Sequence, residues 1–274
     1  MIHIGTSGFS YEDWVGKWYP SGLKKADMLR YYARRFSALE VNFTYYRMPT
    51  ARTLQQMSAK TGEGFRFVVK ANSEMTHERT AEPEVFRVFQ EALRPLTDEG
   101  KLGCLLAQFP NSFKPDDESL RYLHYFREQL PEVPTVIEFR NRGWLTADTF
   151  DLLEALDLGF CCVDEPALKG LLPPVALRTS DLGYVRFHGR NAGQWYGHEE
   201  AWQRYNYLYS EEELREWVDK VQAIAEGSGE TFVFFNNHYQ GQAAMNAEMF
   251  AALLELPLGD GSAGGLFGPG DAEQ

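Results

Sequence analysis

Short runs in which hydrophobic and polar residues alternate recur along the chain, and segments with helical spacing separate most of them. In YVRFHGR, at 184–190, the hydrophobic Val185 and Phe187 alternate with charged or polar neighbours. Because a β-strand places successive side chains on opposite faces, this run predicts a strand with one apolar and one charged face. Similar runs predict eight strands, at residues 2–7, 38–43, 65–71, 102–109, 134–140, 158–164, 183–189 and 231–237.

Amphipathic segments between these runs predict helices on the outside of a sheet. Thr146 and Ser210 are expected to be N-caps, and Glu213 completes a capping box with Ser210. Residues 165–182 show no convincing helical pattern, so the sixth connection is expected to be a weak helix or a loop. The predicted helices are residues 26–36, 83–96, 118–130, 146–156, 210–225 and 236–256.

Alternating strands and helices of this number match the size of an α/β protein with a single (β/α)8 TIM-like barrel. We predict that residues 1–257 form the barrel domain and that residues 258–274, rich in Gly, Asp and Ser, form a flexible C-terminal tail. An open, doubly wound sheet is the alternative. It would usually carry a glycine-rich dinucleotide turn after its first strand, and GTSGFS is not that fingerprint.

Composition and charge narrow the classes of partner. Hydrophobic residues make up 44% of the chain, enough for a sizeable core, and the net charge is −12. An acidic total disfavours nucleic acid and anionic membranes as partners, but it is compatible with a local cationic pocket. There is no signal-peptide pattern or spanning segment, and three cysteines do not make a disulfide framework. A cytoplasmic protein is therefore expected, with protein partners left open.

The strand pattern also predicts which side chains line the barrel. If the oily positions of each strand face the outer helices, the opposite positions face the interior. These inward positions are mostly polar and lie toward the carboxyl ends of the strands, where active sites of this fold are found. The inward polar set comprises His3, Glu40, Asn42, Lys70, Gln108, Glu138, Arg140, Cys162, Asp164, Arg186, His188 and Asn236.

A paired network that merely fills the barrel is the alternative interpretation of these charges. Three cations, Lys70, Arg140 and Arg186, would then offset Glu40, Glu138 and Asp164. That arrangement desolvates many charges, each at a cost on the order of several kcal/mol, where Leu and Val would pack more favourably. The pattern therefore favours a functional pocket at the C-terminal mouth.

Seven blocks of sequence also carry a family resemblance. They are GTSGFSYEDWVGKWYP, LEVNFTYYRMP, FRFVVKANSEMTH, LAQFPNSF, IEFRNRGWL, VRFHGR and FVFFNNHYQGQAAMNA. Together they resemble the YecE-like family, also called DUF72, in order from residue 3 to about residue 255. The resemblance implies a TIM-like barrel related in shape to the xylose-isomerase and endonuclease-IV-like groups. It implies no reaction, because the family is functionally uncharacterised.

The loops after the seventh and eighth strands often form a phosphate site in this fold. Here they begin HGRN and NNHYQG, and Gly189 would let the backbone approach a ligand. Arginine forks suit phosphate or carboxylate groups. The predicted ligand-binding residues are Lys70, His77, Gln108, Arg140, Arg186, Arg190, Asn236 and Asn237.

Candidate catalytic residues are Glu40, Glu138, Asp164 and His188, which suit acid–base chemistry if their surroundings separate their pKa values. The favoured hypothesis is an enzyme, a hydrolase, lyase or isomerase, that uses no metal or cofactor and acts on a small phosphorylated or carboxylated compound. A metal-dependent phosphoesterase, nuclease or isomerase could use the same four residues as ligands, although no HxH or HExxH spacing is present. A binding or scaffold protein without turnover is the third alternative.

Two aromatic-rich segments, GFSYEDWVGKWYP and GQWYGHEEAWQRYNYLYS, are predicted to be long loops. They are expected to form a hydrophobic lid that covers the barrel and replaces the missing sixth helix. A surface that stacks against a flat ligand is the functional alternative, and both roles are compatible.

Overall fold

A single parallel sheet forms the centre of the molecule in the computed structural model, which describes residues 1–259. The strand order is β6-β5-β4-β3-β2-β1-β9-β8-β7. The strands at the two ends of this order are consecutive in the chain and are separated only by Cys161, so the sheet curls into a barrel with eight strand positions. The strands are β1 Ile2–Ser7, β2 Ala38–Val41, β3 Arg66–Lys70, β4 Leu102–Gln108, β5 Thr135–Glu138, β6 Leu158–Phe160, β7 Cys162–Asp164, β8 Leu182–Phe187 and β9 Glu230–Phe235.

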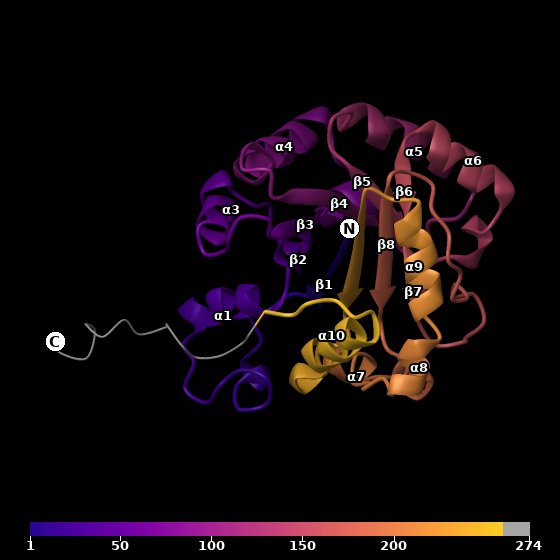
Figure 1. Cartoon of the computed structure of the whole chain (residues 1–274). Helices are drawn as coiled ribbons and strands as arrows, with labels where there is room; N and C mark the ends of the chain where they lie inside the picture. Colours follow the sequence, from indigo (N-terminus) through magenta and orange to yellow (C-terminus); the bar gives the residue numbers. More distant parts are fainter. Residues whose placement is uncertain (260–274) are drawn as a thin grey trace.

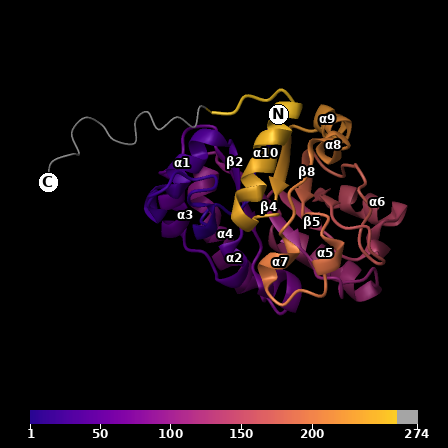
Figure 2. The ribbon, with the colours of Figure 1, turned by 90° about the horizontal axis from the view of Figure 1, so that it is seen from below.

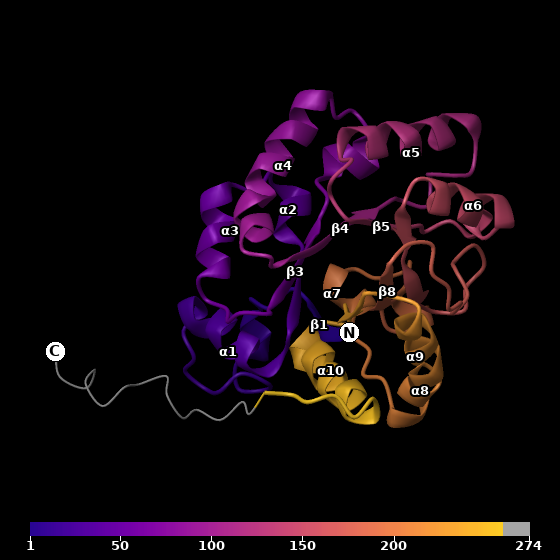
Figure 3. The same cartoon turned by 45° about the horizontal axis from the view of Figure 1, so that its top comes forward.

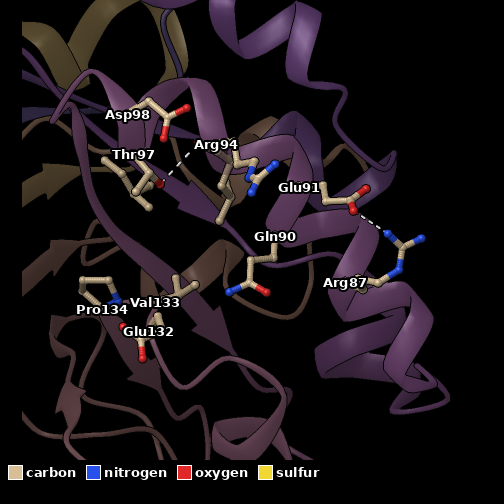
Figure 4. A pocket seen from close by; sticks show the side chains of 11 residues that line it. Arg87, Gln90, Glu91, Arg94, Thr97, Asp98, Glu132, Val133 and Pro134 are labelled. Atoms are coloured by element: carbon tan, nitrogen blue, oxygen red, sulfur yellow. Dashed lines mark hydrogen bonds and ion pairs between the residues drawn. The ribbon is translucent and has the colours of Figure 1, made fainter.

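Helices surround these strands and complete the predicted TIM-like α/β barrel (Figures 1 and 3). The larger helices follow one another around the sheet in chain order, whereas the short helix α7 is drawn inside this ring in Figure 3. Figure 2 shows α7 together with α2 on one side of the molecule. The helices are α1 Met28–Arg35, α2 Phe43–Tyr46, α3 Ala51–Ser58, α4 Pro83–Asp98, α5 Asp117–Gln129, α6 Ala147–Ala155, α7 Ala201–Arg204, α8 Glu211–Arg215, α9 Val218–Glu226 and α10 Gln242–Leu253.

Local sequence signals account for several of the helix boundaries. The Thr146 hydroxyl accepts the backbone N–H of Thr149 at the start of α6, and Ser210 and Glu213 form a reciprocal capping box at α8. Both predicted caps are confirmed. The segment predicted as one helix over 210–225 is two, α8 and α9, and the helices α2 and α3 between β2 and β3 were not predicted.

The sixth connection contains no helix, as predicted, because residues 165–181 are irregular. This segment covers the outer face of the barrel by itself: Leu171 and Leu172 are buried, and the Leu177 backbone contacts the Cys162 sulfur. The expectation that aromatic loops fill this place is therefore wrong for the first of them. Its Trp14 and Trp18 pack with each other, and Trp18 contacts Phe36, which follows α1.

The outer faces of the strands are apolar and pack under the helices. Phe187 of β8 contacts three aromatic residues of the outer layer. Tyr209 lies just before α8, Trp217 lies between α8 and α9, and Phe250 belongs to α10. Its neighbour Arg186 faces the interior instead. The predicted parity of β8 is thus correct, and burial of its apolar face stabilises the fold by about 1.5–3 kcal/mol per large side chain.

The predicted parity of the sixth strand position is wrong. Asp164 accepts hydrogen bonds from Tyr209 and Trp217 in the outer layer, and the Cys162 sulfur contacts the backbone of Leu177. These two side chains therefore point away from the barrel interior. The segment GFCCV, at 159–163, is apolar on both faces, so hydrophobicity alone did not identify the inner one. Phe160 packs outward against α6, and the alternation from Phe160 carries residues 162 and 164 to the same side.

The predicted tail, residues 258–274, lies almost entirely outside the residues that the structure describes. No helix in the described part of the chain is both long and apolar enough to cross a membrane.

Candidate functional site

A charged network crosses the barrel interior and is centred on Arg186. The Arg186 guanidinium donates to both oxygens of Glu40, at 2.9 and 2.6 Å, and its Nη1 donates to Glu138 Oε2 at 2.5 Å. Nη2 also lies 3.3 Å from the Ser7 hydroxyl, and Tyr184 donates to Glu40 Oε2 at 2.7 Å. One arginine thus joins β8 to β1, β2 and β5.

Arg140, which follows β5, extends this network toward the mouth. Its Nε lies 2.7 Å from Glu138 Oε1, and its Nη1 donates to Glu165 Oε2 at 3.1 Å. Burial alone would raise the pKa of Glu138, but Arg140 and Arg186 together lower it well below its ordinary value. Glu138 is therefore an anion at neutral pH. We refer to Glu40, Glu138, Arg140, Glu165 and Arg186 as the inner charge network.

This geometry limits what Arg186 can do. It is 1% exposed, and Nε, Nη1 and Nη2 are all engaged by protein oxygens. A ligand would have to displace Glu40 or Glu138 to reach its fork. Each of the three nitrogens of Arg186 already donates to a protein oxygen, so its contacts favour a structural role, and its predicted role in anion binding stays a prediction.

His188 is buried at the end of the same strand. Its Nδ1 lies 3.1 Å from the Asn236 side-chain nitrogen, and its Nε2 lies 3.3 Å from Glu138 Oε1. When the Asn236 amide donates to Nδ1, the neutral ring carries its proton on Nε2, facing Glu138. Burial and the nearby Arg140 hold the pKa of His188 well below its ordinary value. Its ring is therefore neutral at physiological pH.

Lys70 stands at the carboxyl end of β3 and differs from the other cations. Its ammonium donates to Gln108 Oε1 at 2.8 Å and lies 4.6 Å from the centre of the Tyr45 ring. In residues 1–259 it has no carboxylate within ion-pair distance. Burial and the nearby Arg186 lower the pKa of Lys70 to about 7. A large fraction of this amine is therefore neutral at physiological pH.

His77 lies near Lys70 and contacts the same tyrosine, Tyr45. It belongs to the single π-helical turn Glu74–Glu78, and its ring packs edge-on against Tyr45 at 4.8 Å. Burial, Lys70 and Arg140 lower the pKa of His77 to about 4. The structure thus brings His77, Lys70, Gln108 and Arg140 close to one another, and their role in binding a ligand stays a prediction.

Sequence reasoning missed one cation of the mouth. Arg204, at the end of α7, lies 4.1 Å over the buried Trp195 ring, and it is close enough to Arg140 and Glu165 to affect its charge. Burial lowers the pKa of Arg204, although the guanidinium remains protonated. Among the residues with described side chains it forms no ion pair or hydrogen bond. Only the tertiary fold brings this loop arginine over the barrel, so no local signal marked it.

Glu165 takes the place in the network that Asp164 was expected to hold. Besides Arg140, it accepts the backbone N–H of Leu172 at 3.0 Å, and burial raises its pKa. Because Glu165 directly follows Asp164, the correction of the strand parity exchanges the two carboxylates: Glu165 faces inward and Asp164 outward.

Two other predicted residues belong to the outer layer or to the loop anchors. Arg190 binds both oxygens of Asp164, at 2.9 and 2.7 Å, and also pairs with Glu216. Asn237 is buried and donates to the Tyr207 carbonyl and to Asn246. The structure does not bring Asp164, Arg190 and Asn237 together with Lys70.

Gly189 illustrates how these anchors hold the loop after β8. Its φ is +89°, a conformation that side chains rarely adopt, and a Cβ there would lie 2.8 Å from Tyr207 Cβ. The backbone at Gly189 was predicted to lie close to a ligand, but in the structure it packs closely against Tyr207.

The donor set also bears on the metal-dependent alternative. No group of three or more His, Cys, Asp or Glu side chains within residues 1–259 is arranged to hold a metal ion. Both oxygens of Glu40 and both of Glu138 lie against arginine nitrogens. A divalent cation would therefore compete with guanidinium groups for these carboxylates.

Comparisons with known proteins match almost the whole chain and point to the same family. The model of a family described as "Protein of unknown function DUF72" matches residues 3–262. The UPF0759 protein YunF of Bacillus subtilis is 32% identical over 272 residues, covering 93% of this chain and 95% of that protein. Among solved structures, a DUF72 family protein from Thermotoga maritima is 42% identical with a TM-score of 0.86, covering 93% of this chain and 99% of that one. A DUF72 family protein from Enterococcus faecalis is 29% identical with a TM-score of 0.84, covering 94% and 96%.

Proposed function

The chain belongs to the DUF72 family of proteins of unknown function, and we propose that it is an enzyme that acts on a small anionic substrate at the C-terminal mouth of its barrel. In this proposal Arg204 binds the anionic group of the substrate, Arg140 supports it, and Lys70 meets the reacting part. No metal ion is needed for these roles.

Two cations of the mouth that lack a carboxylate partner among the described residues carry this proposal. Four cations, Lys70, Arg140, Arg186 and Arg204, face three carboxylates, Glu40, Glu138 and Glu165, which leaves one positive charge when Lys70 is protonated. The inner charge network accounts for two of the cations. The other two lack carboxylate partners within residues 1–259, and a partly desolvated arginine of this kind favours a carboxylate or phosphate.

The reactive role of Lys70 is supported by its surroundings. A lysine amine that is partly neutral near pH 7 can accept a proton or attack a carbon atom, which a fully charged lysine cannot. Gln108 and Tyr45 fix the position of this amine without supplying a negative charge that would keep it protonated.

Binding is tested by thermal denaturation of the purified protein in sodium phosphate, sulfate or pyruvate, at constant ionic strength. An anion at 100 times its dissociation constant stabilises the folded state by about 2.7 kcal/mol. We expect stabilisation of the wild type and its loss in Arg204→Met. The matched control is Arg87→Met, because Arg87 lies on the exposed face of α4 and pairs with Glu84. Equal responses of the wild type and Arg204→Met would contradict an anion site at Arg204.

Turnover is tested by incubating the protein with a pool of small cellular metabolites and following the pool by mass spectrometry. We expect an anionic compound to disappear with the wild type and to persist with Lys70→Met. Binding of the anion without any turnover would contradict the enzymatic part of the proposal and would favour a ligand-binding protein.

A further inference from the structure

The amine of Lys70 is positioned differently from a lysine that only binds an anion. It makes one hydrogen bond, to the neutral amide of Gln108, and one face of it is covered by the Tyr45 ring. Building on the proposed function, we propose that Lys70 is a nucleophile that forms an imine with the carbonyl group of an anionic aldehyde or ketone. The substrate class is thus a small carbonyl compound that also carries a carboxylate or phosphate.

The division of labour among the cations supports this assignment. Arginine is always charged and binds carboxylate through a planar fork, so Arg204 is the better anchor for the anion. An amine that is partly neutral is a poor anchor, but it has the free electron pair that a nucleophile needs. Burial has the largest effect on Lys70 and favours the neutral amine, and the nearby Arg186 and Arg140 act in the same direction, whereas Glu138 and Glu40 oppose them.

The bond changes require no redox partner. The electron pair of the Lys70 nitrogen forms a bond to the carbonyl carbon, and the C=O π electrons move to the oxygen. That oxygen takes up one proton and then, after a second proton transfer, leaves as water while the nitrogen forms the C=N bond. Both protons come from the former amine, so one carbonyl compound and one amine give one imine and one water.

Two side chains of the mouth are suited to move these protons. His77 is neutral and packs against the same Tyr45 ring that covers Lys70. Glu165 is a buried carboxyl in the inner charge network, and within residues 1–259 it accepts hydrogen bonds only from Arg140 and the Leu172 backbone. A carboxyl in such surroundings can hold a proton that a solvated one would release.

Reductive trapping tests the proposal. The full-length protein is incubated with glyoxylate or pyruvate and sodium cyanoborohydride, which reduces an imine to a stable amine, and the modified lysines are mapped by mass spectrometry. We expect Lys70 to be labelled at least about tenfold faster than the exposed lysines, because solvated lysines are almost fully protonated at pH 7. Propanal and acetone, uncharged carbonyl compounds of similar size, should label Lys70 more slowly than glyoxylate and pyruvate do, because they lack the anionic group that Arg204 binds.

Variants show whether the labelling depends on the site. Lys70→Met should abolish the fast-labelled position, whereas Lys25→Met, at an exposed lysine in the connection before α1, should preserve it. Arg204→Met should slow labelling of Lys70 by glyoxylate without changing the slow labelling of exposed lysines. The mapping within the wild type needs no variant, so it remains decisive even if Lys70→Met fails to fold.

The outcomes separate this inference from the proposed function. Uniform labelling of all lysines, with the Arg204-dependent stabilisation by anions intact, would overturn the imine and leave the anion-binding enzyme standing. Fast labelling of Lys70 that is equal for pyruvate and acetone would overturn the anionic substrate class. Absence of both the selective labelling and the stabilisation would overturn the two proposals together.

Discussion

Arg186 holds both carboxylate oxygens of Glu40, with Nε 2.9 Å from Oε2 and Nη2 2.6 Å from Oε1, in the closed interior of the barrel. This contact makes each residue depend on the other. A buried charge without its partner is unfavourable, whereas the pair itself is tolerated because each member solvates the other. The relationship explains how a TIM-like barrel of this family accommodates charges where apolar residues usually pack.

Removal of Arg186 is therefore expected to destabilise the protein. Arg186→Ala leaves Glu40 and Glu138 without their shared cation, and breaking such a buried pair costs about 3–5 kcal/mol. Urea denaturation at pH 7 measures this loss. The double variant Arg186→Met with Glu40→Gln should recover part of it, because it removes one charge of each sign. A loss below about 1 kcal/mol in the single variant would contradict the structural role of Arg186.

Replacement of Lys70, unlike that of Arg186, is expected to stabilise the protein, by an amount that depends on pH. The pKa of Lys70 is about 7 in the folded protein and near the ordinary value of 10.5 in the unfolded chain, so the unfolded chain binds more protons between these values. The folded wild type therefore gains stability as the pH rises from 7 toward 10, by less than about 1.4 kcal/mol per pH unit.

Lys70→Met removes this titration. We expect it to be more stable than the wild type at pH 6–7, and the difference should shrink as the pH approaches 10. Denaturant midpoints of both proteins at several pH values measure the trend. A difference that stays constant across this range would show that Lys70 keeps an ordinary pKa.

Two adjacent carboxylates that point in opposite directions at the end of β7, Asp164 and Glu165, offer a matched comparison. Asp164→Asn should destabilise the protein by a few kcal/mol, since Asp164 accepts from Tyr209, Trp217 and Arg190 in the outer layer. It should leave stabilisation by phosphate or pyruvate unchanged. Glu165→Gln should alter that stabilisation, because Glu165 pairs with Arg140 in the mouth. If Asp164→Asn abolished the response to anions, the site would lie on the outer face instead.

Metal content gives a further prediction. Protein purified without chelator should contain far less than one equivalent of zinc, manganese or iron, because arginines already occupy the oxygens of Glu40 and Glu138. Elemental analysis by mass spectrometry measures this. One equivalent of metal that disappears in Glu138→Ala would favour the metal-dependent alternative.

The fold was predictable from sequence because its signals are local and repeat along the chain. Apolar alternation in β8 and the caps at Thr146 and Ser210 depend on neighbouring residues, and all three predictions are confirmed. The parity of the sixth strand was not predictable in this way. Both faces of the segment 159–163 are apolar, so only tertiary contacts, such as the packing of Phe160 against α6, identify the outer one.

For the candidate site, the sequence predicted some of the residues that face the barrel interior but not how they pair. Strand parity identified Lys70, Glu138 and Arg140, whereas the partners of each charge depend on side-chain geometry across the barrel. Sequence could not show that Arg186 is fully paired while Lys70 is not. The position of Arg204 at the mouth could not be predicted either, because Arg204 lies on a short helix within a long connection, and tertiary contacts set the position of that connection.

The members of the inner charge network pair with one another, and this has a consequence for how related proteins can diverge in sequence. Arg186 takes its charged partners, Glu40 and Glu138, from the strands β2 and β5, and Arg140 and Glu165 follow directly after β5 and β7. Arg204 and His77, by contrast, are carried by loops or short turns. A substitution in those loops leaves no strand charge unpaired, so it can alter ligand preference at little cost to the fold. The paired charges of the barrel interior can thus stay the same while substitutions in the loops at the mouth change which ligand is bound.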